Sequence, residues 1–361
     1  MHSRSLTKQM FVVGMLALLA LTLVPAGVLA QDDAGIPAPF DSADARPTIA
    51  LVRFIGDGAF MARYLAGAQA MADELGMELV EYNARNDQAQ MVTMLENAIA
   101  SSPDAIIISH GTTDVVQPLV LQALDQGIHV VTFDTVIDDP RVPEIEQDDL
   151  LIGFDLTKYV AIQTGGDAEV IYLNIAGFPP LDKRDRSYQS FLWRYPSFEQ
   201  VAQVGVYVEG GTSAETQTRM EATLSEHPEA NVAIAMWDEL AKGAVRAIEQ
   251  LGLSDQIDVY SVDISDENIQ MMTAEGSPWA ATIATDPYST ARVAVRSAAA
   301  LIAGEGVPKY LLVAPTMVTQ DFLRENNITN MDELKDALPA FGESELSWLP
   351  WMYRLMLEAQ S

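Results

Sequence analysis

The sequence predicts an α/β fold built from two doubly wound parallel sheets. Apolar strand-like runs alternate with helix-like stretches, and this alternation restarts at Leu151. One pattern also occurs in both halves, an apolar run that ends in an aspartate, at residues 128–134 and again at 257–263. Ligands of open parallel sheets bind beyond the carboxyl ends of the strands. Asp134 and Asp263 therefore predict two similar lobes that each offer a carboxylate to something held between them.

The expected elements follow one another with short connections. A buried apolar run starts the series at residue 48, and Gly76 stops the helix after it. The first half is expected to contain strands 48–55, 78–82, 105–109 and 128–133 and helices 61–75, 88–100 and 115–126. The second half is expected to contain helices 151–164, 187–195, 214–226, 239–251 and 266–274 and strands 169–175, 202–208, 232–236, 257–262 and 280–284.

The N-terminus has the pattern of a secretory signal peptide. Arg4 and Lys8 precede an apolar stretch at 10–24, and small residues at 28–30 provide a cleavage site. The stretch is shorter than the roughly 20 residues that span a bilayer, and an uncleaved anchor is the alternative. Residues 1–30 are therefore expected to be a signal cleaved on export to the periplasm or another extracytoplasmic space. Residues 31–46 are expected to be a flexible tether.

Composition excludes several classes of function. The 361-residue chain has a formal charge of −30, and without the two basic residues of the signal it would carry −32. Such a chain repels phosphate backbones and anionic membranes, so nucleic acid is not an expected partner, and the acidity is interpreted as a solvated surface. The absence of cysteine excludes disulfides, thiolate metal sites and a lipidated cysteine. No spacing of ligands predicts a metal site or a cofactor.

About 330 residues remain after the signal, more than one core usually serves, so two domains are expected. Turn-forming or prolyl stretches at 147–149, 285–287 and 314–316 suit crossings between lobes that absorb a hinge rotation. The first lobe is placed at 47–148 plus 286–314, and the second at 149–285 plus 315–330.

Residues 331–361 are expected to form a helical C-terminal extension. Its apolar residues recur at helical spacing, namely Trp348, Trp351, Met352, Leu355 and Met356. Such a stripe must be covered. The chain's own second lobe is the expected cover, and a membrane partner or a bilayer surface is the alternative.

Six segments together carry a resemblance to a known family. They are TIALV at 48–52, GAQ at 67–69 with Ala72 and Leu75-Gly76, DAIIIS at 104–109, FD at 133–134, WDELAKGA at 237–244 and WAATIA at 279–284. In this order they resemble the type I periplasmic sugar-binding proteins of bacterial ABC importers, the ribose- and galactose-binding group, from about residue 48 to residue 319. Sugar-responsive repressors share this fold, but here a signal peptide stands where their DNA-binding helices would be.

The resemblance implies two Rossmann-like lobes joined by a three-stranded hinge. The lobes would close over a monosaccharide or polyol and deliver it to ABC permease subunits, without a cofactor. We expect the protein to be a monomer.

A sugar presents adjacent hydroxyls and apolar C–H faces, so its site needs acceptors, donors and an aromatic wall. Asp134 and Asp263 fit the acceptor role, because one carboxylate can accept from two adjacent hydroxyls. The alternative for each is a cap on the helix that follows. The resemblance favours the ligand.

In the first lobe the resemblance implies that Phe60 stacks on the sugar, with ordinary packing in the first helical turn as the alternative. A ligand asparagine of the family aligns near Gly58, so its amide is absent here. Asp57 or Arg53 could replace it, and Phe54 could add a second wall.

Two departures from the family pattern change the expected pocket. Thr135 stands where many pentose and hexose binders carry arginine, and Trp237 stands where the family has asparagine. The pocket is therefore expected to be more aromatic and suited to a different sugar, a polyol or a modified sugar. Asp238 is expected to cap the next helix. Thr285 is either a weak donor or part of the hinge.

The second lobe is implied to supply an arginine from residues 183–186. Arg186 is preferred and Arg184 is the alternative, with a solvated charge run as the other interpretation. His110 ends a strand that points toward the cleft, so it is a candidate contact, with a loop histidine as the alternative.

These observations predict the solute-binding component of an ABC importer. A sugar-sensing protein for a chemoreceptor or sensor kinase is the alternative, followed by a secreted carbohydrate-active enzyme with paired carboxylates. The sequence contains no G-x-S-x-G, P-loop, G-x-G-x-x-G or H-E-x-x-H motif. A binding protein is therefore expected rather than an enzyme.

Overall fold

The computed structural model describes residues 35–42, 45–56, 58–208, 210–342 and 344–359. The chain divides into two units, residues 1–35 and 36–361, and every described helix and strand belongs to the second unit. The predicted signal peptide at 1–30 lies outside the described residues, as does Asp57 among the predicted site residues.

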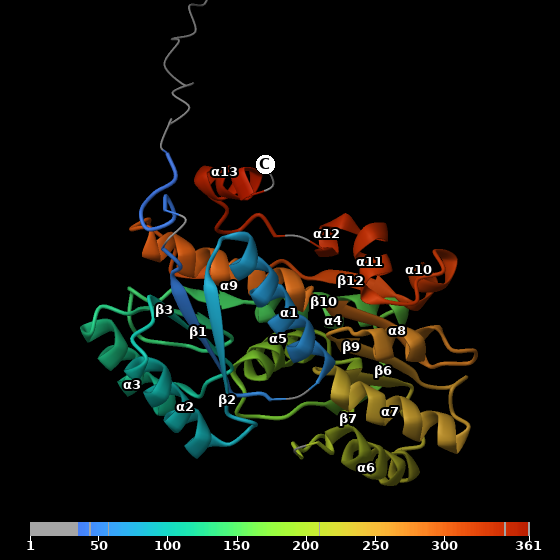
Figure 1. Cartoon of the computed structure of the whole chain (residues 1–361). Helices are drawn as coiled ribbons and strands as arrows, with labels where there is room; N and C mark the ends of the chain where they lie inside the picture. The colour runs from blue at the N-terminus through green and yellow to red at the C-terminus, as the bar shows by residue number, and fades with distance from the viewer. Residues whose placement is uncertain (1–34, 43–44, 57, 209, 343, 360–361) are drawn as a thin grey trace, which may run out of the picture. The chain divides into compact units, whose positions relative to one another are not determined.

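A parallel sheet forms the centre of the first lobe (Figure 1). Its described strands, in order across the sheet, are β11 (Tyr310–Leu312), β5 (Glu144–Glu146), β4 (His129–Phe133), β3 (Ala105–Ser109), β1 (Thr48–Arg53) and β2 (Glu78–Asn83). All neighbouring pairs are parallel. Strand β3, with the sequence AIIIS, is buried along its whole length, as expected for a parallel strand covered on both faces.

A second sheet forms the centre of the second lobe. Its described strands, in order, are β12 (Thr316–Thr319), β10 (Trp279–Ala284), β9 (Asp258–Val262), β8 (Val232–Ala235), β6 (Ala168–Leu173) and β7 (Phe198–Val204). Its neighbours are parallel except for β12, which pairs with β10 in the antiparallel direction.

Helices cover both sheets. They are α1 (Ala59–Glu74), α2 (Gln88–Ala100), α3 (Thr113–Asp125), α4 (Asp149–Gln163), α5 (Pro179–Arg194), α6 (Thr212–Glu226), α7 (Asp238–Leu251), α8 (Asp266–Thr273), α9 (Pro287–Ile302), α10 (Gln320–Glu325), α11 (Met331–Ala337), α12 (Pro339–Gly342) and α13 (Pro350–Ala359). Alternate residues of β1 enter different cores, Ile49 with α1 and α9 and Ala50 with α2 and α3. The first sheet therefore has a layer of helices on each face.

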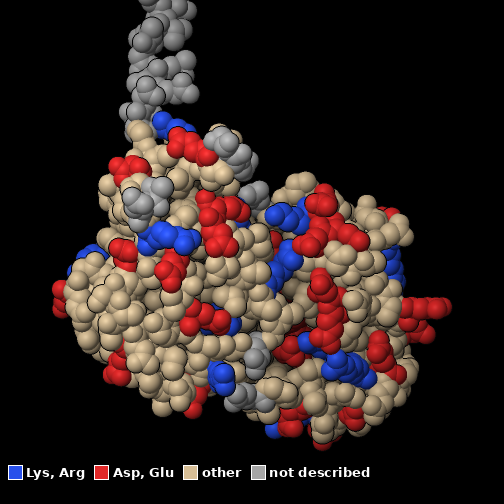
Figure 2. Space-filling view, in the orientation of Figure 1, with Lys and Arg blue, Asp and Glu red and all other residues tan. Residues whose placement is uncertain are grey.

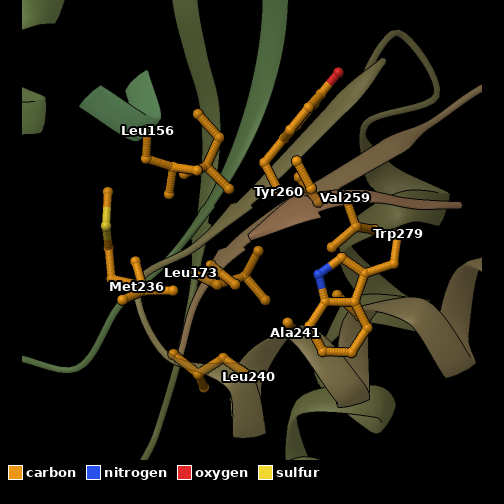
Figure 3. Close-up of a cluster of buried hydrophobic side chains, with 14 of the residues drawn as sticks. Leu156, Leu173, Met236, Leu240, Ala241, Val259, Tyr260 and Trp279 are labelled. Carbon is orange, nitrogen blue, oxygen red and sulfur yellow. The ribbon is translucent and has the colours of Figure 1, made fainter. Parts of the chain in front are cut away.

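The core of the second lobe is continuous around its sheet. Trp279 on β10 is fully buried, and its indole N–H donates to the hydroxyl of Ser261 at 2.9 Å. Figure 3 shows this ring beside Val259 of β9 and Ala241 of α7. A tryptophan can be buried this deeply because its one polar atom has a partner.

The described chain passes between the two sheets at three places, which are residues 147–148, 285–286 and 313–315. Two of these crossings contact each other, because the Thr285 hydroxyl donates to Oε1 of Gln147 at 2.8 Å. The predicted α/β class, with two doubly wound and mostly parallel sheets, is confirmed.

The C-terminal residues contact both lobes. Leu334 and Phe341 belong to the core of the second lobe, whereas Trp351 and Met352 belong to the core of the first. The expectation that the second lobe covers the apolar stripe is therefore wrong. Trp351 lies 4.7 Å from the ring of Phe40, which is buried although it falls in the predicted tether. This contact joins segments that are 311 residues apart in the sequence, so local composition could not indicate it.

Buried Arg296 of α9 attaches the C-terminal segment to the first lobe. Its guanidinium donates to the carbonyl of Ser344 at 2.7 Å and to that of Leu346 at 2.9 Å, and it lies over the ring of Trp348. No helix in the described ranges is both long and apolar enough to cross a membrane. Figure 2 shows acidic side chains at many places on one face, with fewer basic ones among them.

Candidate binding site

A cavity of about 430 Å³ lies beyond the carboxyl ends of the strands of both sheets. The first lobe contributes Ile55, Phe60, Met61, Asn86, His110, Asp134 and Gln147, among others. The second lobe contributes Ile175, Phe178, Leu181, Arg184, Tyr207, Trp237, Asp238 and Asp263, among others. The cavity is therefore lined by charged and amide groups together with a large apolar surface.

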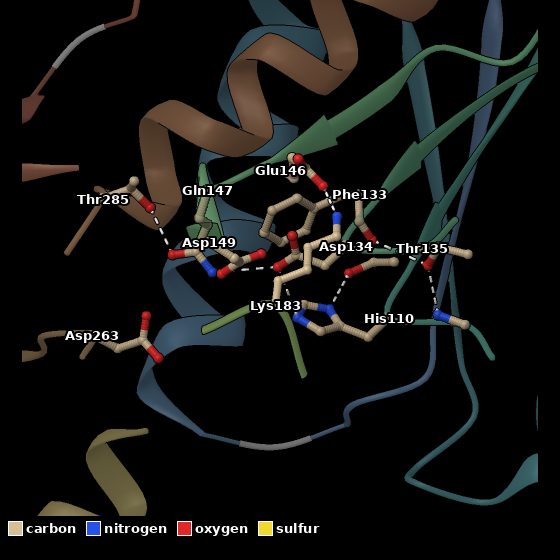
Figure 4. A network of polar contacts seen from close by, with 12 residues as sticks. His110, Phe133, Asp134, Thr135, Glu146, Gln147, Asp149, Lys183, Asp263 and Thr285 are labelled. Atoms are coloured by element: carbon tan, nitrogen blue, oxygen red, sulfur yellow. Dashed lines mark hydrogen bonds and ion pairs between the residues drawn. The ribbon is translucent and has the colours of Figure 1, made fainter. Parts of the chain in front are cut away.

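Asp134 follows β4 in a left-handed backbone conformation, with φ of 48°. Its Oδ2 lies 3.4 Å from Nε2 of His110 and accepts from the amide of Gln147 at 3.3 Å. Its Oδ1 is buried and has no partner among the described residues. Burial, then the charge of Asp149, raise the pKa of this carboxyl well above its usual range. One acceptor oxygen therefore remains for a ligand (Figure 4).

His110 follows β3 and also has a positive φ, 60°. Its Nδ1 lies 2.8 Å from the Ser109 hydroxyl. Burial, then the charges of Arg184 and Arg53, lower its pKa to about 3. The imidazole is therefore neutral near pH 7, so it can donate through one nitrogen and accept through the other.

Arg184 is the buried cation of the site. Its Nε donates to Asp149 at 2.8 Å, and its Nη1 donates to the carbonyl of Met236 at 2.7 Å and lies 3.4 Å from Oδ2 of Asp263. These contacts fix the plane of the guanidinium within the cavity wall.

The structure favours Arg184 over Arg186, the residue preferred from the sequence. Helix α5 begins at Pro179, whereas the sequence predicted a helix at 187–195. The run 183–186 is therefore helical, and helical spacing places Arg184 on the buried face with Tyr188. Arg186 lies two positions further along, is exposed and does not line the cavity.

Asp263 follows β9 with φ of 72°, and its Oδ1 is buried without a partner among the described residues. Burial raises the pKa of the Asp263 carboxyl above its usual value, although the charge of Arg184 opposes this shift. Neither Asp263 nor Asp134 caps a helix, because Ser265 caps α8 and Asp148 caps α4. The capping alternative for these two residues is therefore excluded.

At the start of α7 the structure gives Asp238 a different role from the one expected. Trp237 is the N-cap residue, and no side chain makes a capping hydrogen bond there. Asp238 is the first helical residue and lines the cavity, so its prediction as a cap is wrong. Burial, then Asp263 and Glu239, raise its pKa to about 8. The half-buried ring of Trp237 also lines the cavity.

Phe60, on the first turn of α1, lines the cavity. Its ring is nearly parallel to that of Phe133 at 6.3 Å and meets His110 edge-on at 6.4 Å. Phe54, proposed as a second wall, is instead buried in the core of the first lobe and does not line the cavity.

Three other predicted residues have internal partners and do not line the cavity. Arg53 forms an ion pair with Glu81 on β2. The Thr135 hydroxyl accepts from the backbone N–H of Gly111 at 2.7 Å and so positions a loop. Thr285 bonds to Gln147 at the hinge. Their contacts explain why polar residues near strand ends need not reach the ligand.

Several lining residues were not identified from the sequence. Gln147 was assigned to a hinge stretch, although its amide also holds Asp134. Phe178 and Tyr207 lie in the loops after β6 and β7, with ring centroids 5.5 Å apart. Their position just beyond two strands was the signal that could have indicated them. Lys183 pairs with Glu146 between the lobes (Figure 4).

A cavity between the strand ends of two sheets that are joined by three crossings defines a two-lobed binding protein. This chain belongs to the periplasmic binding protein family, whose domain matches residues 49–306. Within that family it is of the type I group that resembles ribose-binding proteins, as the sequence indicated.

Comparisons with known proteins show several relatives of high coverage. A 5-methylthioribose transporter solute-binding protein from Thermotoga lettingae, solved in complex with 5-methylthioribose, is 58% identical, covers 86% of this chain and 98% of its own, and superposes with a TM-score of 0.83. A sugar ABC transporter protein from Yersinia enterocolitica is 28% identical, covers 90% of this chain and 98% of its own, with a TM-score of 0.84. The ribose import binding protein of Escherichia coli is 28% identical, over 74% of this chain and 88% of its own. The expectation of a binding protein rather than an enzyme is thereby confirmed.

Proposed function

We propose that this chain is the extracytoplasmic solute-binding component of an ABC importer and that its ligand is 5-methylthioribose. The lobes capture the sugar in the cavity, and the closed form is presented to the permease. The ligand is suggested by the Thermotoga lettingae protein, because 58% identity over 86% of the chain is far above the 28% shared with the Escherichia coli ribose protein.

The observation that carries this proposal is the pair of buried carboxylates on opposite lobes. Asp134 and Asp263 each have one oxygen without a partner among the described residues, and both line the cavity. Sugar hydroxyls would supply the missing donors. A ligand that bonds to both carboxylates joins the lobes, so its binding favours the closed state over the open one.

The neutral imidazole of His110 and the guanidinium of Arg184 complete the polar contacts. Arg184 donates to sugar oxygens, and His110 can donate or accept. Phe60 and Trp237 offer ring faces to the apolar C–H surface of the sugar. Asp57, which lies outside the described residues, remains a candidate ligand contact.

Export and architecture are part of the same proposal. Residues 1–30 act as a cleaved signal, and the mature monomer consists of a first lobe at 47–148 plus 286–314 and a second lobe at 149–285 plus 315–330. N-terminal sequencing of the exported protein should begin at Gln31, and a start at Met1 would contradict cleavage.

Isothermal titration calorimetry of the purified protein tests the ligand. We expect 5-methylthioribose to bind at least about tenfold more tightly than ribose, since the sulfur and the methyl carbon are two methylene-sized groups and each contributes about 0.8 kcal/mol when buried. Xylitol, allitol and allose serve as competitors of similar size. If ribose or a polyol binds more tightly than 5-methylthioribose, the ligand assignment is wrong and the importer role stands. If none of these compounds binds, the whole proposal is wrong.

A further inference from the structure

The second sheet places its cavity-lining side chains in a polar-to-apolar order. The sheet order is β10, β9, β8, β6, β7. Asp263 follows β9, next to the hinge strand β10, whereas Trp237 follows β8, Phe178 lies beyond β6 and Tyr207 lies beyond the edge strand β7. Three strand spacings separate β9 from β7, roughly 14 Å. The carboxylate of Asp263 and the paired rings of Phe178 and Tyr207 are therefore at different ends of the cavity.

The first sheet repeats this order. Its strands run β5, β4, β3, β1 from the hinge side outward. Gln147, Asp134 and His110 follow β5, β4 and β3, and Ile55 and Phe60 lie beyond β1. The two sheets therefore place Asp134, Asp263 and Gln147 at the inner end of the cavity and Phe60, Phe178 and Tyr207 at its outer end.

Helix α5 spans both ends. Phe178 is its N-cap residue and Arg184 lies six residues further on, which is about 9 Å along a helix axis. One rigid element therefore fixes the separation between the guanidinium that contacts the sugar and the aromatic ring at the outer end.

Phe178 also contacts both lobes. It belongs to the second lobe, but it packs against the core of the first as well as its own, and Ile55 packs against the same first-lobe core. Its ring lies 5.5 Å from that of Tyr207. The outer end is consequently complete only when the lobes are together.

Polar side chains also line the outer end, among them Arg246, Asn86, Thr212 and Ser213. Arg246 is bonded to Ser213 at 3.0 Å and to Glu267 at 3.1 Å. Glu267, which does not line the cavity, compensates the charge of Arg246, and the Thr212 hydroxyl donates to the carbonyl of Val208 at 2.9 Å. Arg246, Thr212 and Ser213 are therefore already bonded to the protein.

We infer that the outer compartment, formed by Ile55, Phe60, Phe178, Tyr207 and Trp237, holds the methylthio group of the ligand and that Phe178 determines selectivity for it. The inference rests on the proposed function. A thioether packs well against the aromatic rings of this compartment, whereas a 5-hydroxyl there would lose water and compete for polar side chains that are already bonded to the protein. Since Phe178 bridges the lobes, the substituent also favours closure.

The test is the ratio of dissociation constants for ribose and 5-methylthioribose, measured by calorimetry. Phe178→Ala should lower this ratio about tenfold relative to wild type, because the substituent loses its apolar cover. Trp193→Ala removes an aromatic ring from the same helix at a position that is 87% exposed, and it should leave the ratio unchanged. Asp263→Asn should weaken both sugars alike, with the ratio kept within about twofold.

The outcomes separate the inference from the proposed function. If wild type prefers 5-methylthioribose and Phe178→Ala keeps that preference, the compartment assignment is wrong and the importer function stands. Equal binding of both sugars by wild type also overturns the assignment, whereas binding of neither overturns the proposed function itself. Should circular dichroism show that Phe178→Ala is unfolded, Phe178→Leu and Tyr207→Ala replace it, and an unchanged ratio in Tyr207→Ala would again contradict the inference.

Discussion

Replacing Asp238 by asparagine tests whether the carboxyl group of Asp238, which lines the cavity, is protonated in the folded protein. Asp238 begins α7, is 8% exposed and lies beside Asp263 and Glu239. Burial, then these acidic neighbours, raise its pKa to about 8. The unfolded chain loses the same proton at roughly pH 4. Between these values the folded state binds more protons at this group, so its contribution to stability falls as the pH rises.

The magnitude follows from proton linkage. One extra proton in the folded state changes the free energy of unfolding by about 1.4 kcal/mol per pH unit. His110 acts in the opposite direction, because burial, with Arg184 and Arg53, lowers its pKa to about 3. Its contribution is lost as the pH falls below roughly 6.5 and is constant above that value. The interval from about pH 6.5 to 8 therefore reports on the buried carboxyl groups without His110.

Urea denaturation of ligand-free protein at half-unit steps across that interval measures the effect. The stability of Asp238→Asn relative to wild type should rise with pH by up to about 1.4 kcal/mol per unit and level off above about pH 8. Asp336→Asn, on the exposed side of α11, removes the same charge outside any core and should show a constant difference. A constant difference for Asp238→Asn would refute a protonated Asp238.

Three further substitutions have expected outcomes. Asp134→Ala should weaken ligand binding at least about 100-fold in calorimetry, because a ligand hydroxyl loses its acceptor oxygen and the amide of Gln147 loses its buried partner; binding close to that of wild type would make Asp134 structural. Trp351→Ala should lower the free energy of unfolding by about 3–5 kcal/mol in urea, because the ring is buried against Phe40, and a loss below about 1 kcal/mol would place α13 outside the cooperative fold. Gly67→Ala should cost about 1–3 kcal/mol, since a Cβ there would lie 2.2 Å from the carbonyl oxygen of Tyr288. An unchanged melting temperature would contradict this close approach of α1 and α9.

The architecture was predictable because apolar residues recur with a different period in strands than in helices, so the two kinds of element can be told apart in the sequence. The position of Asp134 and Asp263 at strand ends also followed from the sequence, because an apolar run that stops at an acidic residue is a local pattern. Helix α5 was placed eight residues too late. Pro179 and Pro180 begin it, as proline at the first helical positions often does, and this shift exchanged the two candidate arginines.

Other features depend on contacts between distant segments. Phe178 and Tyr207 come together only because β6 and β7 are neighbours in the sheet. Arg53 is a residue type that often contacts ligands, but β2 places Glu81 beside it and the two form an ion pair. The assignment of individual side chains to the ligand stays a prediction for the binding experiments.

The composition of the first lobe's core bears on how the protein is made. That core contains residues of β1, near the start of the chain, together with α9, β11 and the side chains of Trp351 and Met352. Trp351 and Met352 follow β1 by about 300 residues, so the ribosome adds them after every strand of the second lobe. The core of the lobe that begins first therefore becomes complete only after the strands of the second lobe have been made.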